Sequence, residues 1–215
     1  MELSRGENTK AKDVMVIDLY REFKEKVLLE LKAEPDETKR YLKFMAWLNS
    51  KLEGKGIGRI IITGGFAVEV YTARTHRTMD VDIIVEGKEA VRIIEEFLKQ
   101  ISERIGRGYL PYHEALTTKS IDIVSTKYTK TMEPVKLQVN QGHVYLEPPE
   151  ELIITYLASW KYWKSTEDRD KAIWLYITWN NKLNKEYLKK RAIQEKVEDK
   201  LKEIEETIKH HKHSN

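Results

Sequence analysis

Two aspartates separated by one residue lie in a short apolar run. Asp80 and Asp82 flank Val81, and Ile83 follows them. Because alternate side chains of a β-strand project to the same face, this spacing places both carboxylates on one face and the apolar side chains on the other. The two carboxylates repel each other, and a hard divalent cation, which prefers oxygen ligands, would relieve that repulsion. The alternative is a strand face exposed to solvent.

A third aspartate interrupts a later apolar run. Asp122 lies between Ile121 and Ile123. A carboxylate buried there without a partner would be costly. The cost disappears if Asp122 completes the acidic cluster from a neighbouring strand. An aspartate on an edge strand, in contact with water, is the alternative.

A pair of glycines is the third feature that could take part in binding or catalysis. Thr63, Gly64 and Gly65 lie between a β-branched run, residues 59–63, and a segment from Phe66 onward that has a helical pattern. Glycines let the backbone pass close to a bulky ligand, and the start of a helix presents N–H groups and a positive dipole end. The sequence therefore predicts a phosphate site here, with a tight turn that binds no ligand as the alternative.

The elements that must position these residues follow from the apolar periodicity. We expect an α+β fold with a small mixed sheet, flanking helices, an N-terminal helical pair and a C-terminal helical region. The predicted helices are at 11–33, 37–52 and 88–105 and across most of the chain after 149; the predicted strands are at 59–63, 81–85, 109–117, 120–124 and 144–146. The expected divisions are residues 1–56, 57–147 and 148–215.

The amino-acid composition excludes several kinds of functional site and argues against several classes of protein. The 215 residues include 38 Lys plus Arg and 35 Asp plus Glu, a balance that offers few spare contacts to nucleic acid phosphates. The absence of Cys excludes disulfides, thiolate nucleophiles and Cys-ligated metals. No apolar run approaches the roughly 18–20 residues of a membrane span, and the N-terminus lacks a signal-peptide core. We therefore expect a cytoplasmic protein without a membrane partner.

Taken together, the glycine turn, the Asp-x-Asp strand and the later strand acid have a specific order. This order resembles the nucleotidyltransferase fold of the DNA polymerase beta superfamily. The sequence is most similar to the minimal nucleotidyltransferases, including AbiEii-like toxins, in Gly64-Gly65-Phe66-Ala67 and in Arg77-Thr78-Met79-Asp80-Val81-Asp82. The likeness covers residues 58–126 and extends weakly into the helices after 148.

The resemblance implies a metal-dependent enzyme that transfers a nucleoside monophosphate from a nucleoside triphosphate such as ATP. Two Mg²⁺ ions, or Mn²⁺, roughly 3.5–4 Å apart, would be held by three catalytic acids. The implied acids are Asp80, Asp82 and Asp122, and the implied nucleotide-binding residues are Thr63, Gly64, Gly65, Arg77, Lys161 and Asp168.

The acceptor stays open between a tRNA or other RNA end, a protein hydroxyl and a small molecule. A toxin or phage-defence role, with an antitoxin partner, also fits the resemblance. The alternative from a different class is a binding or regulatory module without turnover. Phe66 favours this alternative, because many relatives carry Ser or Thr at that position to contact phosphate. The three mutually repelling acids oppose it.

Overall fold

The computed structural model describes the backbone of residues 3–213 and the side chains of residues 13–209. The chain forms two compact units. The first contains the chain up to Ile62 together with Thr78–Thr129 and Lys136–Leu146. The second contains Thr63–Arg77, Lys130–Val135 and the chain from Glu147 onward. The division into three consecutive segments stays a prediction.

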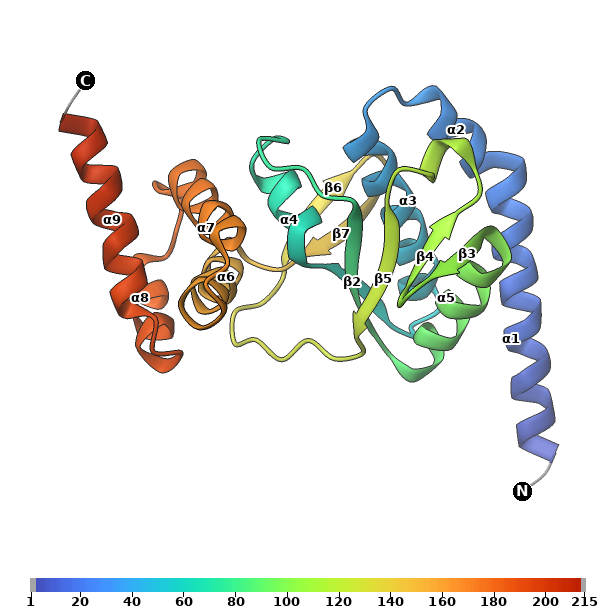
Figure 1. Ribbon diagram of the computed structural model, residues 1–215. Coiled ribbons are helices and arrows are strands. Elements are labelled where there is room, and N and C mark those ends of the chain that lie inside the picture. The colour runs from blue at the N-terminus through green and yellow to red at the C-terminus, as the bar shows by residue number, and fades with distance from the viewer. Residues whose placement is uncertain (1–2, 214–215) are drawn as a thin grey trace. The chain divides into compact units, whose positions relative to one another are not determined.

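Helices and strands alternate in the middle of the chain and helices occupy its two ends (Figure 1). The elements are α1 (Leu3–Glu22), the π-helix η1 (Phe23–Val27), α2 (Leu28–Ala33), α3 (Glu37–Gly54), β1 (Arg59–Ile62), α4 (Gly64–Tyr71), β2 (Asp80–Glu86), α5 (Lys88–Ile101), β3 (Ser102–Ile105), β4 (Gly108–Pro111), the 3₁₀-helix η2 (Glu114–Leu116), β5 (Ser120–Ser125), β6 (Val135–Val139), β7 (Gly142–Leu146), α6 (Pro149–Trp163), α7 (Thr166–Trp179), α8 (Lys185–Gln194) and α9 (Glu198–His213). In the described part of the chain, no helix has an apolar stretch long enough to span a bilayer.

The described strands form one seven-stranded mixed sheet in the order β3-β4-β5-β2-β1-β7-β6. Strand β1 pairs antiparallel with β2 and parallel with β7, and β2 pairs parallel with β5. The predicted α+β class with a small mixed sheet and flanking helices is confirmed.

The predicted helix at 88–105 is wrong over its last turn. Helix α5 ends at Ile101, and residues 102–105 form β3. The segment pairs with β4 in a hairpin whose turn contains Gly106, at a φ of 59° that suits glycine. The strand predicted from Tyr109 to Thr117 ends at Pro111 and is followed by η2.

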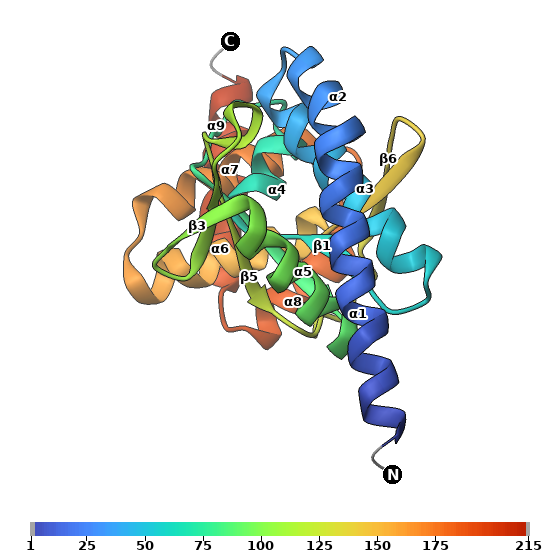
Figure 2. The same ribbon diagram turned by 90° about the vertical axis from the view of Figure 1, so that its right-hand side faces the viewer.

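An aromatic cluster joins the helices of the first unit to one another. The ring centroid of Phe23 lies 5.8 Å from that of Phe44 on α3 and 5.8 Å from that of Phe97 on α5. Helix α1 lies alongside α3 and α5 (Figure 2). On the strands, Val81 and Ile121 are fully buried in this core, whereas the aspartates next to them are only half-buried. The helical layer therefore covers the apolar face of β2 and β5 and leaves the acidic face on the other side.

The second unit is helical. Tyr71 at the end of α4 packs edge-on against Trp179 of α7, with ring centroids 5.1 Å apart. Glu151 of α6 is fully buried and pairs with Arg191 of α8 at 3.2 Å. The first contact joins α4 to α7, and the second joins α6 to α8. The predicted helical region after residue 148 is confirmed.

Candidate active site

The register between β2 and β5 brings two of the predicted acids side by side. In this parallel pair, Asp82 is the partner of Asp122, and Asp80 is the partner of Ser120. Paired residues on neighbouring strands, which are about 4.8 Å apart, project to the same face. Asp80 shares that face because it lies two residues before Asp82. The three acids therefore occupy one face of two adjacent strands, and all three are half-buried.

A hydroxyl group holds a carboxylate on each of these strands. Thr78 Oγ1 donates a hydrogen bond to Asp80 Oδ1. Ser120 Oγ donates to Asp122 Oδ1 at 3.1 Å. In both cases the hydroxyl residue lies two positions before the acid, so each bond fixes one carboxylate oxygen and leaves Oδ2 for a ligand. Thr78 is part of the sequence motif, but neither its hydrogen bond to Asp80 nor that of Ser120 to Asp122 was predicted from the sequence.

A glycine on the neighbouring strand makes room for Asp122. A Cβ atom at Gly108, the first residue of β4, would lie only 1.9 Å from Asp122 Oδ1 and 3.2 Å from the Cβ of Ser120. Non-bonded atoms cannot approach so closely, so the carboxylate of Asp122 lies where any side chain at position 108 would have to be. This constraint was not visible in the sequence, because it depends on which residues of β4 and β5 meet.

The acids have the chemistry of a divalent-cation site but do not form a closed ligand cluster. Carboxylate oxygens are the ligands that Mg²⁺ and Mn²⁺ prefer. Among residues 13–209, no three His, Asp or Glu side chains converge closely enough to hold a metal ion. Like-charged carboxylates oppose such convergence when no cation lies between them. The three acids thus fit the ion by donor type, by face and by strand register.

The glycine turn follows β1 directly and begins α4 in the second unit. Thr63 is the extended N-cap residue, and Gly64 has a φ of 61°, a left-handed conformation that favours glycine. The Thr63 hydroxyl donates to Glu147 Oε2 rather than capping the helix. The first-turn N–H groups of an α-helix have no acceptor within their own helix. The phosphate-binding role of this turn stays a prediction.

Glu147, the acceptor for Thr63, is itself an unusual group. Glu147 is only 4% exposed, and its Oε1 has no hydrogen-bond partner among the described residues. Lys130 Nζ lies 3.9 Å from this oxygen. Burial raises the pKa of this carboxyl above its ordinary value of 4.5, although the hydrogen bond from Thr63 acts in the opposite direction. The burial of Glu147 was not predicted from the sequence, because a glutamate before two prolines is typical of an exposed loop.

The remaining predicted nucleotide-binding residues lie in the second unit, and each has different neighbours. Arg77 is exposed in the loop after α4. Lys161, near the end of α6, forms a 2.6 Å ion pair with Asp199, which raises the pKa of the lysine. Asp168, in the first turn of α7, pairs with Lys171 at 3.1 Å. Lys161 and Asp168 thus have different ion-pair partners, and their nucleotide-binding role stays a prediction.

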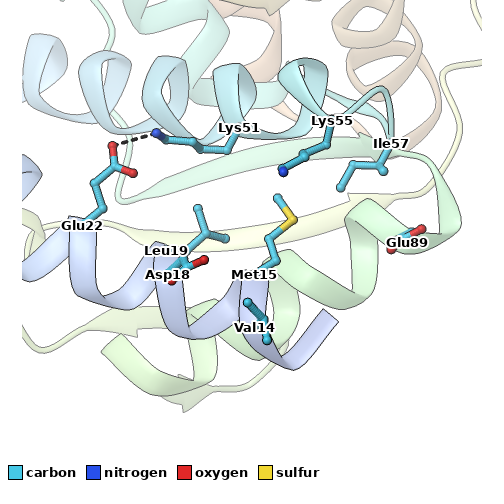
Figure 3. Close-up of a pocket in the computed structure, with 9 residues that line it drawn as sticks. All are labelled: Val14, Met15, Asp18, Leu19, Glu22, Lys51, Lys55, Ile57 and Glu89. Atoms are coloured by element: carbon cyan, nitrogen blue, oxygen red, sulfur yellow. Dashed lines mark ion pairs between the residues drawn. The ribbon is translucent and has the colours of Figure 1, made fainter. Parts of the chain in front are cut away.

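The first unit also contains a hollow away from the acids (Figure 3). Its volume is about 340 Å³, and it lies where α1 faces the end of α3 and the start of α5. Glu22 and Lys51 form an ion pair of 2.7 Å at one end of it (Figure 3). None of the predicted site residues lines this hollow. The chemistry of the acids is therefore not connected with it.

Replacing Gly108 with alanine should displace the carboxylate of Asp122. The added Cβ would overlap Asp122 Oδ1, and such overpacking costs about 1–3 kcal/mol. We expect Gly108→Ala to lower the free energy of unfolding by this amount and to weaken Mn²⁺ binding, both measured on the purified variant. Gly54→Ala is the matched control, because a Cβ there meets no atom within 4 Å. Wild-type Mn²⁺ affinity in Gly108→Ala would contradict the placement of Asp122.

Glu147 should make folding stability depend on pH. Since its pKa is raised in the folded state, the folded state binds this proton more tightly than the unfolded chain does. The contribution is fully present below pH 4.5 and is lost as the pH rises through the folded-state pKa. We expect Glu147→Gln, which mimics the protonated form, to lose this component in denaturation curves measured from pH 4 to pH 8. The exposed Glu206→Gln should retain it, and an unchanged pH profile in Glu147→Gln would show that the carboxyl is not perturbed.

Comparisons with known proteins found similar solved structures of low sequence identity. No protein-family model and no curated protein sequence matches the chain. An antigenic nucleotidyltransferase-like protein from Paracoccidioides brasiliensis is similar in structure, with 18% identity, a TM-score of 0.48, and coverage of 66% of this chain and 76% of that one. The antibiotic-resistance factor ANT(2'')-Ia in solution shows 13% identity, a TM-score of 0.43, and coverage of 80% and 97%. The crystal structure of ANT(2'')-Ia with adenylyl-2''-tobramycin shows 13% identity, a TM-score of 0.46, and coverage of 71% and 94%. All three TM-scores lie below 0.5, so none of these likenesses assigns a family or an activity to this chain.

Proposed function

We propose that this protein is a divalent-metal-dependent nucleotidyltransferase that moves a nucleoside monophosphate from a nucleoside triphosphate to an acceptor hydroxyl. One observation carries the proposal: Asp82 and Asp122 are in register on adjacent parallel strands, with Asp80 on the same face. Three half-buried carboxylates on one face form a concentrated negative charge. A site of this kind is suited to cations that accompany a triphosphate.

The residues have distinct roles in this proposal. Asp80 and Asp82 would hold the ion that accompanies the triphosphate, and Asp122 would share the second ion, next to the acceptor. When bound, the ions neutralise charge on the phosphates and lower the pKa of the acceptor hydroxyl. The hydrogen bond from Ser120 to Asp122 Oδ1 orients this carboxylate, and the carboxylate takes the proton of the acceptor hydroxyl. The acceptor oxygen forms a bond to the α-phosphorus, the bond between the α-phosphorus and its bridging oxygen breaks, and pyrophosphate leaves.

The resemblance also gives the glycine turn, which belongs to the second unit, a phosphate-binding role. Backbone N–H groups of Gly64 and Gly65 are suited to β- and γ-phosphate oxygens. The exposed guanidinium of Arg77 adds a charge-assisted donor.

The proposal also covers the acceptor of the nucleotide and the biological role of the enzyme. The acceptor is an RNA end, a protein hydroxyl or a small-molecule hydroxyl. The AbiEii-like motif in residues 64–67 and 77–82 favours a toxin or phage-defence enzyme over a housekeeping one. Incubation of the protein with each labelled triphosphate and Mg²⁺, in separate reactions with total RNA, a protein extract and a small-molecule extract, distinguishes these acceptors by the fraction that becomes labelled.

A second candidate function is a nucleotidyltransferase-like binding module without turnover. Phe66 favours it, because this side chain is fully buried and offers no hydroxyl to a phosphate. Titration of the wild-type protein with Mg²⁺ and each nucleoside triphosphate tests this candidate. Stabilisation against unfolding without incorporation of label supports the module, and incorporation excludes it.

Replacing Asp82 with asparagine should abolish nucleotide transfer and leave the fold intact. The substitution keeps the size of the side chain but removes the charge from the position that both proposed ions share. We expect a loss of at least a hundredfold in the rate of label incorporation, with an unchanged circular dichroism spectrum. Asp18→Asn, an exposed position on α1, is the matched control. Incorporation at the wild-type rate by Asp82→Asn would show that the metal assignment is wrong.

A further inference from the structure

A lysine is almost completely buried next to the acid-bearing strands. Lys119, directly before β5, is 2% exposed. Its Nζ lies 3.2 Å from Glu37 Oε1 of α3 and donates a hydrogen bond to the backbone carbonyl of Thr78, two residues before β2. A buried ammonium group is costly unless it is paired and hydrogen-bonded. Lys119 satisfies this requirement with one partner on a helix and one at the start of the neighbouring strand.

Tyr41 holds the backbone of the same lysine. This α3 side chain is fully buried. Its hydroxyl accepts a hydrogen bond from the Lys119 N–H at 2.8 Å and donates to the Leu116 carbonyl at 2.5 Å. Burial raises the pKa of Tyr41, so the phenol keeps the proton that it donates. Helix α3 thereby fixes the segment that leads into β5.

These contacts continue to two of the acids through one residue each. Thr78, whose carbonyl binds Lys119, donates its hydroxyl to Asp80. Ser120, the residue after Lys119, donates its hydroxyl to Asp122 at 3.1 Å and its N–H to the Met79 carbonyl at 3.0 Å. The ammonium of Lys119 therefore lies between the starts of the two strands whose acids must act together.

We propose that Lys119, with Tyr41 and Glu37, is a positioning group that sets the separation and orientation of Asp80 and Asp122 and so determines the affinity for the divalent cation. This inference rests on the proposed function, because it assumes that the acids bind a cation. Lys119 acts through Thr78 and Ser120. It also gives the N-terminal helices a role in the chemistry, since both Tyr41 and Glu37 lie on α3.

The test compares two tyrosines that each join α3 to another segment of the first unit. Tyr41→Phe removes the hydrogen bonds to the segment before β5, whereas Tyr145→Phe removes a 2.9 Å hydrogen bond from β7 to Glu53 on α3. Mn²⁺ affinity is measured by electron paramagnetic resonance of the free ion, and stability by thermal unfolding without metal. We expect Tyr41→Phe to weaken Mn²⁺ binding about tenfold, which is typical when a group that orients metal ligands is lost. Tyr145→Phe should leave the affinity unchanged.

Lys119→Met in combination with Glu37→Gln provides a second probe, since it removes the buried ion pair without leaving one charge alone. We expect at least the same loss of affinity from this double variant. If both variants only lower the unfolding temperature and bind Mn²⁺ as the wild type does, the group is merely structural and the inference is overturned. If the wild-type protein itself binds no Mn²⁺, the proposed function fails, and the inference fails with it.

Discussion

The parallel pairing of β2 with β5 is the constraint on which the site depends. It makes Asp82 the partner of Asp122. Because side chains alternate along a strand, a slip of one residue would turn Asp122 to the face covered by the helices and bring Ile121 or Ile123 to the acidic face. The apolar face opposes that slip, since Val81 and Ile121 are fully buried in the core. The same burial that stabilises the sheet therefore sets the acids in register.

The support of this register comes from parts of the chain far from the acids in sequence. Helix α3 contributes Tyr41 and Glu37, which hold Lys119 at the start of β5. Strand β4 contributes Gly108, which leaves space for the Asp122 carboxylate. The helices before the sheet and the hairpin within it thus limit where each carboxylate can lie. Their packing is linked to the chemistry through hydrogen bonds of the backbone and of two hydroxyls.

Much of this arrangement could be predicted from local patterns. Alternation along the strand predicted that Asp80 and Asp82 share a face. The cost of a buried carboxylate left Asp122 open between an edge strand and the acidic cluster, and the order of the three motifs favoured the cluster. Lys119 and Gly108 could not be predicted, because their importance depends on contacts between segments distant in sequence. The helix predicted to residue 105 failed for a related reason. Ile101 and Ile105 continue the helical spacing, but the hairpin at Gly106 and pairing with β4 override it.

Whether Asp82 and Asp122 bind one cation is tested most directly by an anomalous diffraction map, from crystals of the protein grown or soaked with Mn²⁺ and a non-hydrolysable nucleoside triphosphate. We expect a manganese peak with carboxylate oxygens of both Asp82 and Asp122 among its ligands. Ordered manganese found only at other positions, or a map in which Asp122 is turned away from Asp82, would contradict this expectation.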